Sequence, residues 1–303
     1  MIYGGRMELR ITESQALWAI IAAIIGVDAT WAWSLGIRVV LNPVVIPVFC
    51  LIVCINLVYA TVRPDRRIAA LAETIAQLIA FTSSATILSY LTVTSSFPLV
   101  DRYLAGADSV IGFDWLALFM WVHERPLIGK ILFAAYDSGI FQLGVLLVGL
   151  NVLGRLERAR EFVWLFVLTL SIIIPISWLL PAESAWVYFG VTDLANAYHL
   201  AHFSALRAGQ MPEISMTQVN GLITFPSFHT ALGAILIYAT RGIRILFPIY
   251  LGLNVLMITS TPSMGGHYLV DIFAGLAVVP CAIMILRWAQ KARHSQLALA
   301  VEQ

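Results

Sequence analysis

The sequence predicts an all-α, polytopic membrane protein, a helical bundle with about eight transmembrane helices. Three observations support this fold class. Of the 303 residues, 60% are hydrophobic and 12% are charged, and the mean hydropathy is +0.88. Soluble domains are about 45–50% apolar and about 25% charged, so a soluble fold could not hide this much apolar surface. The other two observations are a series of long apolar stretches and a one-sided distribution of positive charge.

A helix that crosses a bilayer needs roughly 20 mostly apolar residues. Eight stretches fit, namely 15–36, 40–62, 74–97, 130–153, 161–181, 226–240, 245–262 and 267–288. The sixth and seventh are separated by Arg241-Gly242-Ile243-Arg244, which predicts a tight turn. One continuous helix is disfavoured there because a charge near the bilayer centre is costly.

The positive charges agree with eight spans. If both termini are cytoplasmic, 13 of the 18 Lys and Arg residues fall on the cytoplasmic side. Such a bias is what the positive-inside rule requires. We therefore expect a multi-pass protein of the plasma (inner) membrane with cytoplasmic termini. The net charge of +1 predicts no nucleic-acid partner.

Two long connections, roughly 98–129 and 182–225, lie on the outer side of this topology. Both interleave aromatic and apolar residues with charged ones. This pattern is typical of helices that lie in the membrane interface, so we expect interfacial helices in both outer loops.

Polar residues concentrate in two segments of the last third of the chain. Pro226-Ser227-Phe228-His229 opens the sixth span. The second segment runs from Ser260 through Gly265-Gly266-His267-Tyr268 to Asp271. In the eight-span topology both segments lie at the non-cytoplasmic face, where antiparallel spans can bring them together.

The spacing of His267 and Asp271 is one helical turn, which places them on the same face. A carboxylate there can accept a hydrogen bond from one imidazole nitrogen and leave the other nitrogen as a nucleophile. Pro226 suits the first turn of a helix, whose free N–H groups bind anions. Gly266 permits close backbone approach to a bound group. With His229 as an acid/base, these are the parts that phosphoryl transfer through a phosphohistidine requires.

These segments resemble two motifs of the type-2 phosphatidic acid phosphatase superfamily. Pro226 to His229 resembles its P-S-G-H motif, and Ser260 to Asp271 resembles its S-R-x5-H-x3-D motif. The segment 221–225 and the Gly-Gly-His-Tyr sequence look closest to the inositol-phosphorylceramide synthase-like branch. The resemblance implies a single membrane domain, 1–303. A six-helix phosphatase-like core would lie within the catalytic part, 71–290, and 1–70 would add N-terminal helices.

The resemblance also implies a role for each matching residue. His267 would be the nucleophile that takes the phosphoryl group, and Asp271 would orient it. His229 would protonate the leaving oxygen and then deprotonate the acceptor. Ser227 and nearby backbone N–H groups would hold phosphate oxygens. This mechanism implies neither a metal nor a cofactor.

Two positions depart from the family pattern. Thr261 replaces the Arg of the second motif, and Leu118 stands where the K-x6-R-P motif has its Lys. A bound phosphate still needs positive charge. Arg125, which keeps the R-P half of that motif, is the first candidate, Arg207 is the second, and Lys130 is the remaining one in the outer loops.

The predicted substrate site also includes Gly266 and Tyr268 from the second motif. Asp137, near the outer end of the fourth span, is placed to line the substrate entrance. A zinc site on His199 and His202, at i and i+3, is the rival interpretation. No third clear ligand accompanies them, so no metal is predicted.

The expected function is that of an integral-membrane enzyme acting on a phospholipid or another lipid phosphate among membrane lipids. Attack by water would make it a lipid phosphatase. Attack by an alcohol acceptor, such as an inositol or ceramide-type hydroxyl, would make it a phosphotransferase, which the branch resemblance favours.

Two alternatives belong to other functional classes. One is a transporter or flippase for an amphiphile, with Asp28 and Asp137 on its path. Transporters usually gather polar residues near the bilayer midplane, whereas here they gather at one face. The other is a non-catalytic membrane scaffold, against which the intact set of His229, His267 and Asp271 argues.

Overall fold

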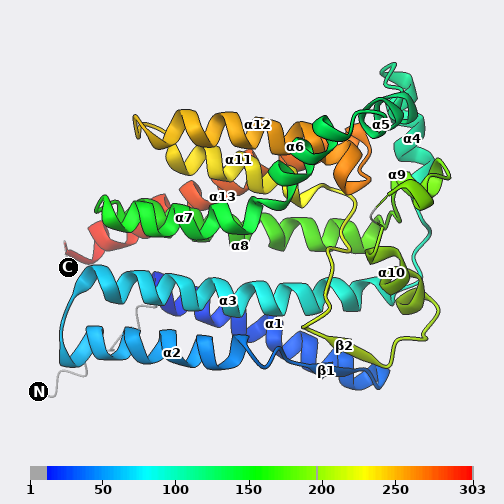
Figure 1. Ribbon diagram of the computed structural model, residues 1–303. Coiled ribbons are helices and arrows are strands. Elements are labelled where there is room, and N and C mark those ends of the chain that lie inside the picture. The colour runs from blue at the N-terminus through cyan, green and yellow to red at the C-terminus, as the bar shows by residue number, and fades with distance from the viewer. Residues whose placement is uncertain (1–11, 196, 302–303) are drawn as a thin grey trace, which may run out of the picture.

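The computed structural model describes residues 12–195 and 197–301, and it is built of helices that run to and fro along one bundle (Figure 1). This confirms the predicted all-α polytopic architecture. Within the described residues, six helical segments are long and apolar enough to cross a membrane. They are α1 (Glu13–Leu35), α2 (Val45–Leu57) continued by the π-helix η1 (Val58–Val62), α3 (Arg66–Val93), α8 (Leu156–Leu179), α12 (Leu246–Gly265) and α13 (Leu269–Val301).

The other two predicted spans are a bent pair and a short helix. Helices α6 (Pro126–Asp137) and α7 (Gly139–Val152) together pass the same test but are bent by 50°. The bend lies at Ser138 and Gly139, and Ser-Gly pairs are common sites of helix kinks. The Ser138 hydroxyl donates to the Ala135 carbonyl at 2.6 Å. The sixth predicted span is α11 (Phe228–Thr240), with 13 residues.

Shorter elements gather at one end of the bundle (Figure 1). They are α4 (Asp101–Val110), α5 (Trp115–His123), α9 (Ala185–Tyr188), the 3-10 helix η2 (Thr192–Leu194) and α10 (His199–Arg207). The α4–α5 pair is apolar enough to be considered as a span, but its two helices meet at 92°. Both predicted outer loops therefore contain helices. The parallel pairing of β1 (Arg38–Val40) with β2 (Glu213–Ser215) was not predicted.

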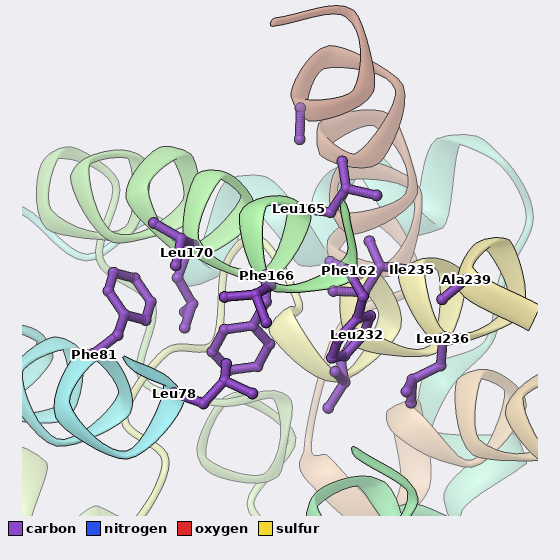
Figure 2. Packing of buried hydrophobic residues seen from close by; sticks show 14 of the residues in the cluster. Leu78, Phe81, Phe162, Leu165, Phe166, Leu170, Leu232, Ile235, Leu236 and Ala239 are labelled. Atoms are coloured by element: carbon purple, nitrogen blue, oxygen red, sulfur yellow. The ribbon is translucent and has the colours of Figure 1, made fainter. Parts of the chain in front are cut away.

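The core lies where α8 packs between α3 and α11 (Figure 2). Phe81 of α3 and Phe166 of α8 meet edge to face at 6.0 Å, and Leu232 and Ile235 of α11 complete the layer. In a bilayer this packing is driven by dispersion contacts more than by exclusion of water. Helix α2 differs because none of its residues is buried. It lies against α3 at the edge of the bundle (Figure 1).

Two helix boundaries differ from the sequence-based predictions, and one buried carboxylate has no hydrogen-bond partner among the described residues. Helix α3 begins at Arg66 instead of 74, because Asp65 caps it by accepting the Arg67 and Ile68 N–H groups. Helix α13 continues to Val301, beyond the predicted span at 267–288, and its Gln, Lys and Ala residues have high helix propensity. Asp28 is buried, and among the described residues neither of its carboxylate oxygens has a hydrogen-bond partner.

Candidate active site

The two polar segments meet where α11 begins and α12 passes into α13. The Ser227 N–H donates to the Asp271 carbonyl at 3.1 Å, which joins the starts of α11 and α13. Gly275 permits this approach, since a Cβ there would lie 2.4 Å from the Ser227 carbonyl oxygen. The Ser227 hydroxyl caps α11 by accepting the Thr230 N–H at 3.4 Å. Helix packing therefore brings His229 and His267 to one place.

His267 lies in the short link between α12 and α13 and is 3% exposed. Its Nδ1 is 2.7 Å from the Thr224 carbonyl oxygen and 3.3 Å from Asp271 Oδ2. Because a carbonyl oxygen only accepts, Nδ1 must carry the proton and Nε2 the lone pair. Burial lowers the pKa of His267 to about 4, although the hydrogen bond with Thr224 works in the opposite direction. The imidazole is therefore neutral at neutral pH, with Nε2 able to act as a nucleophile.

Asp271 serves the backbone as well as the imidazole. Its Oδ2 accepts the Tyr268 N–H at 2.8 Å, so it caps the first turn of α13. The carboxylate is fully buried, and Oδ1 has no hydrogen-bond partner among the described residues. The geometry thus contains the His–Asp contact that the spacing predicted, with the Thr224 carbonyl as a second and closer partner of the same nitrogen.

His229 occupies the first turn of α11 and faces a residue that the sequence did not single out. Its ring stacks on that of Tyr136, with centroids 4.0 Å apart and planes 22° apart. The two histidines, His229 and His267, are near enough for their charges to interact. No motif marks Tyr136, which is one of several aromatic residues in the predicted fourth span.

Two carboxylates on α4 hold the segment that carries His267. Asp101 and Asp108 are seven residues apart and so share one face of the helix. Asp108 accepts the Leu269 and Val270 N–H groups at 2.8 and 3.0 Å. Asp101 accepts the Tyr268 hydroxyl at 2.9 Å and also binds the backbone at 183–184. The outer loop therefore fixes the first turn of α13.

The α5 helix adds a further hold on this segment. Trp115 Nε1 donates to the His267 carbonyl at 2.9 Å. The indole is itself fixed, because it is stacked between Phe119 and Phe189 at 5.2 and 5.0 Å. Sequence patterns could suggest interfacial helices here, but they could not show which polar residues turn inward.

The Asp108→Asn variant is expected to lower kcat by about 10- to 100-fold. An amide can accept one backbone N–H but presents its NH2 group to the other, which leaves a buried donor unpaired. The first turn of α13 and His267 should then shift, and misplacement of a reacting group is costly. Asp114→Asn is the matched control, because Asp114 is exposed and caps only α5 through the Ala117 N–H. Equal losses of kcat in the two variants would contradict a specific role for Asp108.

The opposite wall of the site comes from the loop after α8. The Gly266 carbonyl accepts the Ala185 N–H at 2.8 Å and the Ser184 hydroxyl at 3.1 Å. Gly266 has a φ of +64°, and a Cβ there would lie 2.3 Å from Ser184 Oγ and 2.7 Å from the Trp186 ring. Only glycine suits this position. Gly266 therefore makes room for the side chains of Ser184 and Trp186 beside the backbone.

The two histidines of the rival zinc interpretation have different partners. His199 lies 5.7 Å from the Trp186 ring, and burial, with a smaller contribution from the charge of His267, lowers its pKa to about 4. His202 Nδ1 instead contacts the Tyr90 hydroxyl at 2.9 Å. Among the described residues, no group of three or more His, Cys, Asp or Glu side chains is placed to bind a metal.

The three basic residues that were predicted to bind phosphate lie in different parts of the structure. Arg207 donates to the Phe97 carbonyl at 3.0 Å and interacts electrostatically with Glu183. The Glu183 carbonyl accepts the hydroxyl of Thr224, the residue that binds His267, at 3.1 Å. The Arg207 Nη1 group is buried and has no partner among the described residues.

Arg125 and Lys130 are farther removed from this network. Arg125 folds over Trp121 of α5, donates to its carbonyl at 2.8 Å and pairs with Glu124. Lys130 and Asp137 are exposed on α6. Within the described part of the chain, no hydrogen bond or ion pair joins any of these three to the histidines.

Two further residues of the second motif, Thr261 and Tyr268, make contacts within the protein. The Thr261 hydroxyl bonds back to the Met257 carbonyl at 3.0 Å, so this residue brings no charge to the site. Tyr268 is fully buried and donates to Asp101, so it helps to hold the backbone of the site.

Comparison with known proteins agrees with this geometry at the level of the superfamily. Neither the curated proteins nor the solved structures contain a match to the chain. The sequence profile of the PAP2 superfamily matches residues 102–285, which cover more than half of the chain and include both histidines and Asp271. No comparison supports the inositol-phosphorylceramide synthase-like branch, which stays a prediction. The chain belongs to the PAP2 superfamily.

Proposed function

We propose that this protein is a lipid phosphotransferase that forms a phosphohistidine on His267 and passes the phosphoryl group to an alcohol. Membership of the PAP2 superfamily supports a phosphatase-type lipid enzyme. The observation that carries the proposal is the environment of His267. Its Nδ1 is engaged by the Thr224 carbonyl and Asp271, which leaves a neutral ring with a free Nε2.

Two steps complete the reaction. In the first, His267 Nε2 attacks the phosphorus atom, the bond to the lipid leaving oxygen breaks, and protonated His229 gives that oxygen its proton. In the second, neutral His229 takes the proton of the acceptor hydroxyl, whose oxygen attacks phosphorus. The N–P bond then breaks and His267 is restored. Asp271 keeps the proton on Nδ1 in both steps.

The phosphate needs compensating charge, and we propose Arg207 for this role ahead of Arg125 and Lys130. Arg207 belongs to the same loop network as Thr224 and has a buried N–H group without a partner among the described residues. The first turn of α11, behind Ser227, would add backbone N–H groups that favour an anion. Asp137, exposed at the end of α6, is kept as a residue of the substrate entrance.

Transfer is favoured over hydrolysis because the nucleophile is shielded. His267 is 3% exposed and is covered by α4, α5 and the loop that carries α9. A phosphohistidine that is screened from bulk water survives longer for a second substrate. The inositol-phosphorylceramide synthase-like motifs point the same way and suggest a polyol or ceramide-type hydroxyl as the acceptor.

We further propose that the site faces the non-cytoplasmic side of an inner membrane. The arginine-rich segments at 63–67, 155–160 and 241–244 lie at the opposite end of the bundle from the link between α12 and α13, which contains His267 in the sequence (Figure 1). In this arrangement 1–70 add helices to a catalytic core within 71–290.

The decisive experiment uses the purified protein in vesicles that contain a lipid phosphate labelled with ³²P. We expect little inorganic phosphate without an alcohol, and a new labelled phosphoester when inositol or a ceramide is added. An acid-labile, base-stable label should appear on the protein, and turnover should continue in EDTA. Inorganic phosphate released at the same rate with or without the alcohol would refute transfer. Loss of turnover in EDTA with recovery on adding zinc would refute the metal-independent mechanism.

One observation keeps a transporter as the second candidate. Asp28 is 5% exposed within α1, and neither of its oxygens has a partner among the described residues. Ionisable side chains buried within spans often mark transport paths. Lipid movement across vesicles that persists in His267→Ala but stops in Asp28→Asn would favour this candidate over the enzyme.

A further inference from the structure

Tyr136 stands at the break between the two halves of the bent span. It is the second-last residue of α6, directly before the 50° bend at Ser138. Helix α6 lies along the end of α12 that leads into His267 (Figure 1). Because the span bends here, α6 ends at Asp137, and its last turn lies beside the segment that carries His267.

The ring of Tyr136 lies face to face with His229, at 4.0 Å and with planes 22° apart. A parallel contact of this kind restricts rotation of the imidazole about its last side-chain torsion. The face of a phenol ring also attracts a cation. The contact therefore suits a histidine that must hold one orientation while it gains and loses a proton.

The hydroxyl of Tyr136 reaches toward the other histidine. A Cβ on Gly265 would lie 2.6 Å from this hydroxyl oxygen and 2.7 Å from His267 Cδ2. Both atoms thus crowd the position that a side chain at residue 265 would occupy, which brings the hydroxyl close to the ring of His267. Cδ2 is bonded to Nε2, while Nδ1 is turned to Thr224 and Asp271. The hydroxyl consequently lies near Cδ2, the ring atom next to Nε2.

We propose that Tyr136 serves both histidines: its ring positions His229, and its hydroxyl donates a hydrogen bond to an oxygen of the phosphoryl group in transfer. The inference rests on the proposed function. The tyrosine keeps its proton throughout, so the step adds a hydrogen bond and no proton transfer. A donor at this place offsets part of the positive charge that is missing because Thr261 replaces an arginine.

Two substitutions separate the ring from the hydroxyl. Tyr136→Phe keeps the stacking and removes the donor, so kcat should fall by about 10- to 100-fold, a smaller loss than is typical of an oxyanion donor, while KM for the lipid changes less than about threefold. Tyr136→Leu removes both, so kcat should fall by about a further 10-fold and its pH dependence should change, because His229 is no longer held. Tyr250→Phe is the matched control, since Tyr250 is a buried tyrosine that donates to the Gln142 carbonyl at 2.9 Å, away from both histidines.

The outcomes are distinguishable. Wild-type kcat in Tyr136→Phe would overturn the role of the hydroxyl, and equal kcat and pH profiles in the Phe and Leu variants would overturn the role of the ring. A similar loss in Tyr250→Phe would show that only packing had been disturbed, which would also overturn the proposal. If Tyr136→Leu does not fold, the ring of Tyr136 is needed for packing. The kcat of Tyr136→Phe alone then decides whether the hydroxyl takes part in transfer. A wild-type protein without turnover or labelled histidine would instead refute the proposed function itself.

Discussion

The His267→Gln variant is expected to lose lipid turnover by about 10⁴-fold or more, because covalent catalysis ends when its nucleophile is removed. Glutamine is similar in length and can still donate to the Thr224 carbonyl, so the fold should persist. It has no nitrogen lone pair equivalent to Nε2. Turnover of a labelled lipid phosphate and the acid-labile label on the protein should disappear together.

His123→Gln provides the matched control for this substitution. His123 is exposed at the end of α5 and stacks on Phe119, so it shares the residue type and the same end of the bundle but not the site. Its turnover should stay within about twofold of wild type. Residual turnover above about one per cent in His267→Gln, with the labelled histidine retained, would place the nucleophile elsewhere.

The Gly275→Ala variant is expected to lower turnover by about 100-fold. Alanine normally stabilises a helix by about 1 kcal/mol relative to glycine. Here the added Cβ would lie 2.4 Å from the Ser227 carbonyl oxygen, which is backbone and cannot swing aside. Helix α13 should therefore move away from α11, carrying Asp271 and the His267 segment away from His229. Overpacking of this kind typically costs about 1–3 kcal/mol.

Gly252→Ala tests whether the effect arises from contact alone. Gly252 lies within α12 and is exposed, and a Cβ there would meet nothing within 4 Å. This variant should keep both its melting temperature and its turnover. If Gly275→Ala behaved in the same way, the close approach of α13 to Ser227 would have no part in the site.

The sequence was most informative where one local pattern decides the structure. Apolar length and charged turns predicted the order of the spans, including the turn at 241–244 between α11 and α12. The bend in α6–α7 was not predicted, because hydropathy does not register a kink. The start of α3 was missed because a polar first turn, capped by Asp65, lies outside the apolar stretch.

In the candidate site, too, local patterns could be predicted from the sequence and contacts between distant segments could not. The i,i+4 spacing of His267 and Asp271 and the flanking glycines could be found along the chain. The contacts of Asp108, Trp115 and Tyr136 could not, because they join segments more than 90 residues apart and depend on which face of each helix turns inward. Which of the basic residues binds phosphate stays a prediction. The R-P dipeptide at Arg125 favoured that residue, whereas packing places Arg207 beside the loop of Thr224.

The hold of the outer loop on the start of α13 has a consequence for biosynthesis. The groups around His267 are supplied by α4, α5, α6, the loop of α9 and the link to α13, and so come from chain positions between 101 and 271. The ribosome makes His267, the proposed nucleophile, and Asp271 after most of the membrane-embedded chain. The earlier spans can enter the bilayer in contact with lipid without exposing a working site. The proposed site is then completed late, when α13 inserts and Asp101 and Asp108 of α4 bind its first turn.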